Sequence, residues 1–283
     1  MMYEPSGAPR VTELANPGDE RFRSGADKYA AYLETPEGRL RLDLAFANLQ
    51  EFLPGPAQRL CALDVGSGTG VLGIRLAQLG MHATLLDSSS TMLDFARNAA
   101  RDAKVTERIS LTQGDADQLG SIFGDGSFDL ILCHNVLEFV QDPCAVLRDA
   151  ARLLRDSSGI ISILVRKQPG EVLKAALVNG DLAAAEHSLT AEWGDESLYG
   201  GKVRLFTAES LKAMLASVSL APIAQRGVRV ICDYLPPNIS RDDEYDRIFQ
   251  LERKLGTLPE FAALARYTHC LAHRAGRAID EGA

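Results

Sequence analysis

The chain has 283 residues, a formal net charge of −8, and 46% hydrophobic and 24% charged residues, a composition typical of a folded globular protein. The negative charge argues against general attraction to nucleic acid or to anionic membranes, although it leaves room for a local basic patch. No apolar stretch approaches the roughly 20 residues that span a bilayer, and Met1–Asp19 lacks the apolar core of a signal peptide. We expect this first segment to be a loose tail.

The cysteines are odd in number and scattered, without a Cys-x-x-Cys pair. Three of them lie in apolar runs, which favours buried, reduced thiols in a cytoplasmic protein over a disulfide framework or a zinc site. We predict no metal site. The cysteines are Cys61, Cys133, Cys144, Cys232 and Cys270.

Two segments near the start, Arg21–Gly38 and Leu40–Phe52, carry apolar residues at mostly helical spacing, up to a break at Pro54-Gly55-Pro56. We predict two helices here. They either form a lid over the glycine loop described below or simply pack against the core.

From Gln58 onward, strand and helix signals alternate, and nearly continuous apolar strands imply a parallel sheet with helices on both faces. The predicted strands are Leu60–Val65, His82–Leu86, Ile109–Gln113, Phe128–Cys133 and Ile160–Val165. The first predicted helix follows the first strand and runs to about Leu79. The next two run from about Ser89 to Arg101 and from Pro143 to Leu154.

Beyond Arg166 the pattern loosens, and the stretch 167–205 reads as a helical insertion on the substrate side. Two late strands could pair as a hairpin at one sheet edge and complete a seven-stranded sheet. The predicted organisation is a tail with lid helices (1–56), a cofactor-binding core (57–166), and a substrate-side insertion with strands that complete the same domain (167–283). The late helices are expected at Gly170–Leu177, Leu182–Ala191, Ala208–Val218 and about Asp242–Leu255, and the late strands at Ile223–Ile231 and Tyr267–Ala272.

A glycine loop follows the first strand of this core. The run Leu63–Gly70 reads LDVGSGTG, and an apolar stretch with helical spacing comes next. Glycine supplies turn conformations that residues with a Cβ resist, so a strand that turns tightly into a helix is the simplest interpretation. Such a turn lets a ligand approach the backbone near the positive end of a helix.

Polar residues also follow the next three strands: Asp87, Asp115 and His134. Ligands of open parallel sheets sit beyond the carboxyl ends of the strands. Asp87 follows the first glycine by about twenty residues, the spacing at which an acidic side chain can hold ribose hydroxyls. Together these positions predict a nucleotide-type cofactor.

The glycine spacing and Asp64 distinguish between cofactors. The glycines run GxGxG rather than the GxGxxG of dinucleotide sites. Asp64 lies two residues before the first glycine and suits a ligand with an ammonium group better than a pyrophosphate, while Asp115 and Ala116 could meet an adenine. This favours S-adenosylmethionine over NAD, and hence a methyltransferase over a dehydrogenase. Asp64 could instead cap a helix or brace the loop.

The motifs LDVGSGTG, LLDSS, GDAD and FDLILCHNVLEFV resemble those of class I S-adenosylmethionine-dependent methyltransferases, which have a Rossmann-like, doubly wound α/β sheet. The chain further resembles the tRNA 5-carboxymethoxyuridine methyltransferase family, which esterifies a carboxymethoxy group on the wobble uridine. The segments that carry this second resemblance are Gly38–Arg41, His134–Val140 with Asp142 and Pro143, Gly227–Val230, Asp233–Leu235, Leu251–Glu252 and Ala265–His269.

The family resemblance implies a role for each cofactor residue. Arg41 would reach the cofactor's carboxylate, although its sequence context alone suits a solvated helix charge. His134 would lie at the cofactor edge of the fourth strand, or be a satisfied histidine at a strand end. Gly66, Ser67 and Gly68 would pass beside the methionine moiety, Asp87 would hold the ribose, and Asp115 and Ala116 would flank the adenine. Gly70, Ser88 and Met92 are further predicted cofactor-binding residues.

The acceptor side is expected around Arg229. This residue lies between two valines in an apolar run, so its burial requires a partner. A substrate carboxylate is one candidate and Asp233 is the other. Tyr234 is a further candidate acceptor contact, and Tyr267 and His269 either line the substrate mouth or pack in the core.

The expected chemistry follows from the acceptor. A carboxylate has a pKa near ~4 and is already ionised at neutral pH, so rate would come from alignment and exclusion of water, with no indispensable proton-transfer residue. A phenol or amine would instead require a base such as His134 or His269.

One stretch departs from the tRNA enzymes. They carry a lysine-rich run after the fifth strand, whereas Ala191–Tyr199 is acidic here. Because phosphate contacts carry much of the affinity for nucleic acid, a small-molecule O-, carboxyl- or N-methyltransferase is the alternative. A non-catalytic cofactor-binding subunit is a third hypothesis, disfavoured by the intact loop.

Overall fold

The computed structural model describes residues 17–53 and 57–275. Residues 1–16 of the predicted tail and the predicted break at 54–56 lie outside the described residues. Pro17–Asp19, expected in the tail, instead begins the first helix. Within these ranges, no helix is both long enough and apolar enough to cross a membrane.

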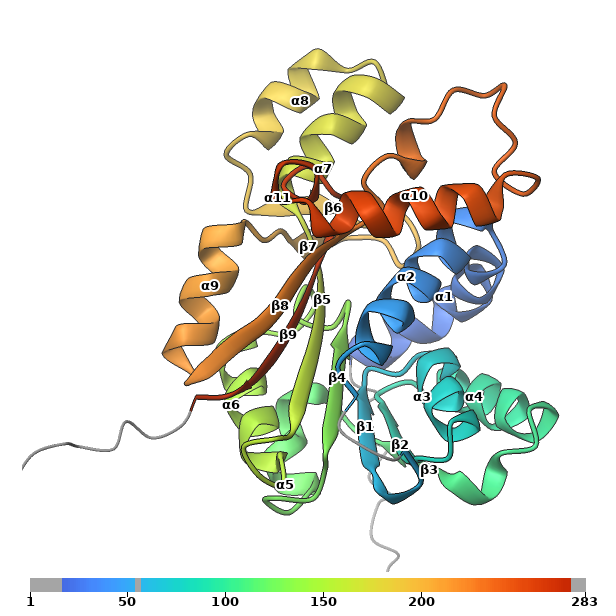
Figure 1. Cartoon of the computed structure of the whole chain (residues 1–283), viewed down its shortest axis with the longest axis vertical. Coiled ribbons are helices and arrows are strands. Elements are labelled where there is room, and N and C mark those ends of the chain that lie inside the picture. The colour runs from blue at the N-terminus through green and yellow to red at the C-terminus, as the bar shows by residue number, and fades with distance from the viewer. Residues whose placement is uncertain (1–16, 54–56, 276–283) are drawn as a thin grey trace, which may run out of the picture.

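Seven strands form one sheet in the order β3-β2-β1-β4-β5-β9-β8 (Figure 1). The first five are parallel, and β9 runs antiparallel between β5 and β8. This arrangement confirms the predicted Rossmann-like sheet and its late edge hairpin. The strands are β1 (Cys61–Val65), β2 (His82–Asp87), β3 (Ile109–Gln113), β4 (Leu130–His134), β5 (Ile160–Arg166), β8 (Leu220–Val228) and β9 (Tyr267–Arg274).

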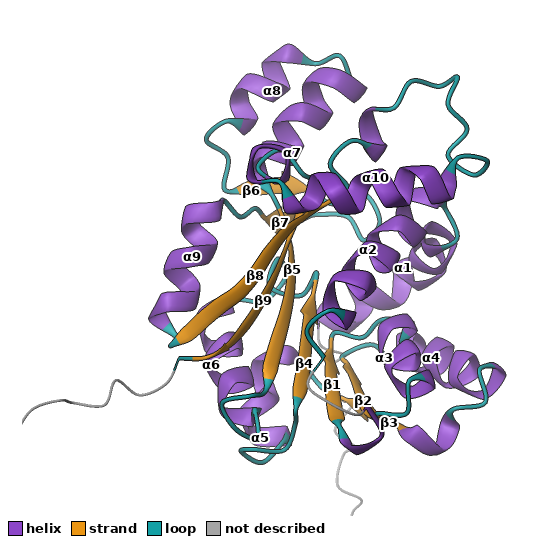
Figure 2. Ribbon diagram, viewed as in Figure 1, coloured by secondary structure: helices purple, strands orange, loops and turns teal. Residues whose placement is uncertain are grey.

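Helices cover both faces of the sheet (Figure 2). Alternate residues of a strand point to opposite faces: Ile131 of β4 joins the core cluster with α6 and α9, whereas Leu130 and Leu132 join the cluster with α2 and α3. The apolar strands are therefore buried on both sides. The covering helices are α3 (Val71–Gln78), α4 (Ser90–Asp102), α5 (Leu119–Ile122), α6 (Pro143–Leu153) and α9 (Ala208–Ser217).

Two helices precede the sheet, α1 (Pro17–Leu33) and α2 (Pro36–Gln50). Thr35 caps α2 by accepting a hydrogen bond from the Gly38 N–H at 3.1 Å. Gly38 is required there, because a Cβ would lie 2.0 Å from the carbonyl oxygen of Tyr32. The tight junction turns α1 back so that it packs against α2 and α4. That the two helices form a lid stays a prediction.

The segment after β5 is an insertion of helices and a small hairpin. It contains α7 (Gln168–Leu173), a π-helical turn (Lys174–Val178), α8 (Leu182–Ser188), and the two-stranded sheet of β6 (Trp193–Asp195) and β7 (Lys202–Arg204). Our sequence analysis predicted the helices but not the hairpin. Helices α10 (Tyr245–Thr257) and α11 (Pro259–Ala262) follow β8.

Several predicted strand boundaries were wrong. Strand β8 begins at Leu220 and not at Ile223, and β9 ends at Arg274 and not at Ala272. Phe128 forms only an isolated bridge with Leu154, so β4 begins at Leu130. The strand expected to reach Ile231 ends at Val228, because Arg229 adopts a left-handed backbone conformation with φ of 60°.

Candidate active site

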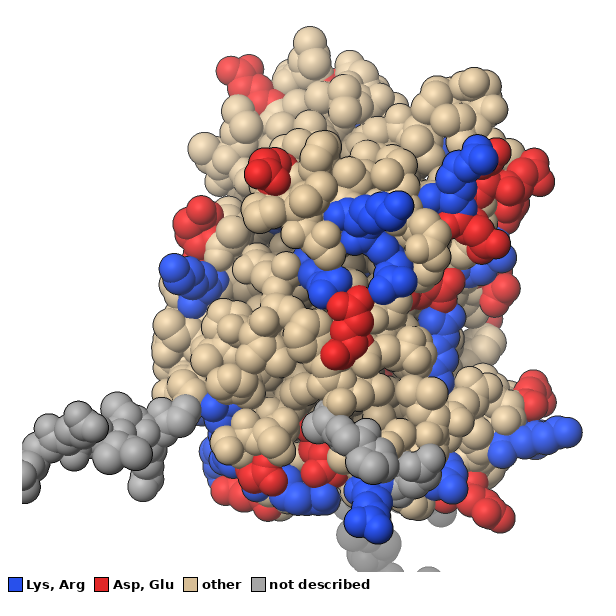
Figure 3. Space-filling model, viewed as in Figure 1, with Lys and Arg blue, Asp and Glu red and all other residues tan. Residues whose placement is uncertain are grey.

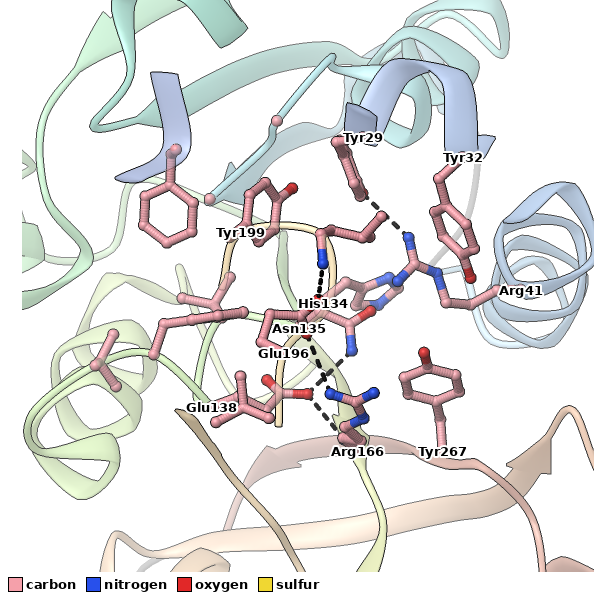
Figure 4. A pocket seen from close by; sticks show the side chains of 18 of the residues that line it. Tyr29, Tyr32, Arg41, His134, Asn135, Glu138, Arg166, Glu196, Tyr199 and Tyr267 are labelled. Atoms are coloured by element: carbon pink, nitrogen blue, oxygen red, sulfur yellow. Dashed lines mark hydrogen bonds and ion pairs between the residues drawn. The ribbon is translucent and has the colours of Figure 1, made fainter. Parts of the chain in front are cut away.

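A cavity of about 340 Å³ lies at the carboxyl ends of the parallel strands, and Phe22, Tyr29 and Tyr32 of α1 form part of its wall. Figure 4 shows side chains from α1, α2, β4, β5, β9 and the insertion converging on it. The predicted site residues on its wall are Arg41, Gly66, Gly68, Asp87, Ser88, Met92, Asp115, Ala116, His134, Arg229 and Tyr267. The predicted residues off its wall are Asp64, Ser67, Gly70, Tyr234 and His269.

The glycine loop approaches its neighbours too closely for side chains. Gly66 has φ of +62°, and a Cβ there would lie 2.6 Å from Val136. Gly68 has φ of +54°, and its Cβ would lie 3.1 Å from the ring of Tyr29. The loop therefore presents bare backbone to the cavity.

Asp87 holds this loop to the start of α4. One carboxylate oxygen accepts from the Gly68 N–H at 2.8 Å, and the other accepts from the Ser89 N–H at 2.9 Å. Ser89 in turn caps α4 through the Met92 N–H. The side chain thus borders the cavity while fixing the backbone on both sides of it.

Asp64 lies behind the loop and is 4% exposed. Its carboxylate accepts from the Gly73 N–H at 3.2 Å, and burial, with the nearby charge of Asp87, raises its pKa to about 7. This contact braces the loop, as the alternative role for Asp64 requires. An ammonium contact stays a prediction, since Asp64 also borders a small pocket of about 30 Å³ together with Gly66 and His134. Ser67, whose N–H donates to the Leu86 carbonyl, serves the same backbone scaffold.

Asp115 forms a capping box at the end of β3. Its carboxylate accepts a hydrogen bond from the Asp117 N–H, and the Asp115 N–H donates to the side-chain oxygen of Gln118. The turn brings Ala116 onto the cavity wall.

Arg41 is buried, at 5% exposed, and is not a solvated helix charge. Its guanidinium donates to the Tyr29 hydroxyl at 3.2 Å and lies over the rings of Tyr29, Tyr32 and Tyr267. Among the described residues no carboxylate pairs with it, and its Nε has no partner. A buried cation without a counterion is the kind of group that an anionic ligand neutralises.

His134 ends β4 on the cavity wall, and its Nε2 hydrogen bonds to Ser162 at 2.8 Å. His269 is 1% exposed beneath it and bonds to the same hydroxyl at 2.8 Å. Burial, together with neighbouring positive charge, lowers the pKa of His269 to about 3 and that of His134 well below its usual value. His269 therefore packs in the core and does not line the substrate mouth, which were the two alternatives for this residue.

Arg229 faces the cavity from the turn after β8. It donates to the Tyr32 hydroxyl at 2.7 Å and pairs with Asp233, one of its two predicted partners. The turn is held by Glu252 of α10, whose carboxylate accepts from the Val230, Ile231 and Cys232 N–H groups at 2.6, 2.9 and 2.8 Å.

Tyr267 begins β9 with its ring between arginines. Arg41 and Arg229 lie 5.8 Å from the ring centroid. Burial acts to raise the pKa of its phenol, but the charges of Arg229, Arg41, Arg166 and Arg266 outweigh it, so the pKa is lowered. Tyr234 lies outside this group, with its hydroxyl 3.5 Å from the Gly170 carbonyl.

Our sequence analysis missed Arg166 and Glu138. Arg166 ends β5 and forms buried ion pairs with Glu171 at 2.6 Å and Glu196 at 3.1 Å. Glu138 accepts from the Arg166 N–H at 2.8 Å and from Asn135 at 3.0 Å, while its second carboxylate oxygen has no partner within residues 17–53 and 57–275. Burial raises its pKa. Both follow a core strand, and this position is the signal that would have found them.

An aromatic group closes the remaining side of the cavity. Tyr199, in the loop of the β6–β7 hairpin, packs with Phe22, Tyr29 and Phe139 at ring distances of 5.1, 5.8 and 6.0 Å. Glu196 ties the same loop to Arg166. The insertion therefore closes the cavity against α1.

The family model described as a methyltransferase domain matches residues 58–217, more than half of the chain. The chain belongs to this methyltransferase family. Its activity is therefore S-adenosylmethionine-dependent methyl transfer.

Relatives of this methyltransferase act on different acceptors. It is 28% identical to the tRNA 5-carboxymethoxyuridine methyltransferase of Escherichia coli over 90% of its own chain and 97% of that protein. It is 30% identical to the ubiquinone biosynthesis O-methyltransferase of Caulobacter vibrioides over 61% of its own chain and 62% of that protein.

Among solved structures, the methyltransferase shares its fold with the 1,6-didemethyltoxoflavin-N1-methyltransferase of Burkholderia thailandensis, which is described with bound S-adenosylhomocysteine. The TM-score is 0.55 and the identity 18%, over 96% of this chain and 94% of that one. The cavity suits such a cofactor, because an unpaired guanidinium lies on one wall and the Asp87 and Asp115 carboxylates on another.

Proposed function

We propose that this methyltransferase esterifies a carboxylate acceptor, that of 5-carboxymethoxyuridine in tRNA. The relative from Escherichia coli supports the choice, because it aligns over nearly its whole length. A tRNA acceptor also implies a cytoplasmic location.

The cofactor's proposed contacts follow from the cavity wall. Arg41 would hold the carboxylate of S-adenosylmethionine, Asp87 the ribose hydroxyls, and Asp115 with Ala116 the adenine. The bound cofactor supplies an electrophilic methyl group on a sulfonium. The protein's share is to align the acceptor oxygen with that methyl group and to exclude water.

The observation that carries the proposal has two parts. An arginine lies on the wall where the acceptor is expected, and the two histidines of the site are unsuited to act as bases. Arg229 lies on the wall with its charge next to the Tyr267 ring. His134 and His269 have lowered pKa values, and the Nε2 atom of each is already engaged by Ser162. An acceptor that arrives ionised needs the first feature and not a base.

A small molecule is the second candidate acceptor. Glu138 offers a carboxylate oxygen without a protein partner on the cavity wall, as a base for a hydroxyl or amine requires. In Figure 3 acidic and basic side chains are interspersed over the face shown, without the broad basic surface that nucleic acid favours. The relatives that methylate small molecules fit this alternative.

Methyl transfer from labelled S-adenosylmethionine into bulk tRNA decides between them. The tRNA is isolated from a strain that makes 5-carboxymethoxyuridine but lacks its methyltransferase, and tRNA from the parent strain, already methylated, is the control. We expect label in the first tRNA alone. No label in either, with S-adenosylhomocysteine still bound in calorimetry, would refute the tRNA acceptor and favour the small molecule.

A further inference from the structure

A chain of hydrogen bonds runs from α2 through the core to the cavity, and no role assigned above uses it as a whole. The Asn48 amide nitrogen lies 3.4 Å from His269 Nδ1. His269 Nε2 lies 2.8 Å from Ser162 Oγ, which lies 2.8 Å from His134 Nε2. Asn48, Ser162 and His269 are each at most 3% exposed.

The direction of this chain follows from the orientation of the Asn48 amide, which turns its nitrogen toward His269. An amide nitrogen only donates, so His269 Nδ1 must accept and its proton is on Nε2. The Ser162 hydroxyl oxygen accepts a hydrogen bond from that N–H, and the single hydroxyl hydrogen is donated to His134 Nε2. In neutral His134 the ring proton is therefore on Nδ1.

His134 Nδ1 has no partner among the described residues. The ring lies beside the Arg41 guanidinium, whose charge contributes to its lowered pKa and whose Nε also lacks a partner (Figure 4). Two donors at one wall of the cavity need an acceptor, and an anionic oxygen is the strongest acceptor for a pair of donors of which one is a cation.

We propose that Asn48, His269 and Ser162 are positioning residues that hold His134 in its Nδ1–H form, as a fixed hydrogen-bond donor to the carboxylate of S-adenosylmethionine beside Arg41. This rests on the proposed placement of that carboxylate and is independent of the methyl acceptor. His134 then acts as a neutral donor and not as a base.

Ser162→Ala breaks the chain, and Ser162→Thr, which keeps a hydroxyl, is the matched control. In protein labelled with ¹⁵N-histidine, long-range ¹H–¹⁵N correlation spectra report which ring nitrogen is protonated, and His134→Gln assigns the signals. We expect the proton on Nδ1 in the wild type and in Ser162→Thr, and a mixture of both tautomers in Ser162→Ala. A wild-type proton on Nε2 would overturn the inference.

Calorimetry tests whether His134 donates to the carboxylate of the cofactor. Ser162→Ala should weaken S-adenosylhomocysteine by up to about fivefold, because affinity falls with the fraction of His134 that keeps its proton on Nδ1. Binding of methylthioadenosine, which lacks the amino-acid moiety, should change less than about twofold. Equal losses for both ligands would overturn the inference. If Ser162→Ala does not fold, Asn48→Leu breaks the chain at its other end, and the same readouts apply.

Discussion

Arg229 is the residue at which the acceptor hypothesis can be tested most directly. Its guanidinium is 8% exposed and its partner Asp233 14% exposed, so Arg229→Ala leaves a buried carboxylate unpaired. Removing one partner of a buried pair costs roughly 3–5 kcal/mol, and the melting temperature should fall on the order of 10 °C. A fall in activity of the single variant could therefore come from lost stability or from a lost acceptor contact, and the variant does not separate the two.

The double variant Arg229→Gln with Asp233→Asn removes both charges and separates the two effects. If Arg229 holds the acceptor carboxylate, the variant loses a charged hydrogen bond of roughly 1.5–3 kcal/mol. That loss lowers kcat/KM for the acceptor by roughly 10- to 150-fold.

Steady-state rates at varied acceptor concentration give kcat/KM for the acceptor, and calorimetry with S-adenosylhomocysteine gives the affinity for the cofactor product. We expect a large fall in kcat/KM with cofactor affinity within about twofold of wild type. Unchanged kcat/KM in the folded double variant would refute an acceptor contact and leave Arg229 a structural residue.

Three further variants test other parts of the site. Glu138→Gln should change kcat by less than about threefold for a carboxylate acceptor, and a fall of roughly 10²–10⁴ would instead identify a general base and a small-molecule acceptor. His269 has a folded pKa of about 3, below its unfolded value near ~6.5, so it is protonated more readily when unfolded and stability falls as pH drops through this window; His269→Gln should flatten the melting temperature between pH 6.5 and pH 4, and an unaltered slope would contradict the assignment. Gly66→Ala should weaken S-adenosylhomocysteine at least about tenfold and cost roughly 1–3 kcal/mol, because φ is +62° and the new Cβ meets Val136. Gly180→Ala, with φ of +65° but nothing within 4 Å, is its control for strain alone, and equal binding losses would rule out the steric reasoning.

The position of the cofactor residues could be predicted from sequence because each of them belongs to a short, local sequence pattern. The glycine loop and Asp87 are tied to strand ends, and strand ends follow from apolar runs. Asp64 shows the limit of this reasoning. Its type and position suited either an ammonium contact or a brace, and only the three-dimensional path of α3 brings the Gly73 N–H to it.

The acceptor side depends on contacts distant in sequence. Arg229 was assigned to a strand because its neighbours are apolar, whereas Glu252, more than twenty residues later, holds the turn that places it. Tyr199 meets Phe22 only because the hairpin folds over the cavity. Periodicity carries no information about such pairs.

Tyr29 and Tyr32 lie one turn apart on α1, and their hydroxyls accept hydrogen bonds from different arginines, Arg41 and Arg229 respectively. If those arginines hold cofactor and acceptor as proposed, a single helix senses the occupancy of both ligands. Binding of either then restricts α1 for the other, and linkage requires the two affinities to change by the same factor. The consequence is positive cooperativity between the two ligands: each raises the affinity of the protein for the other, whichever of them binds first.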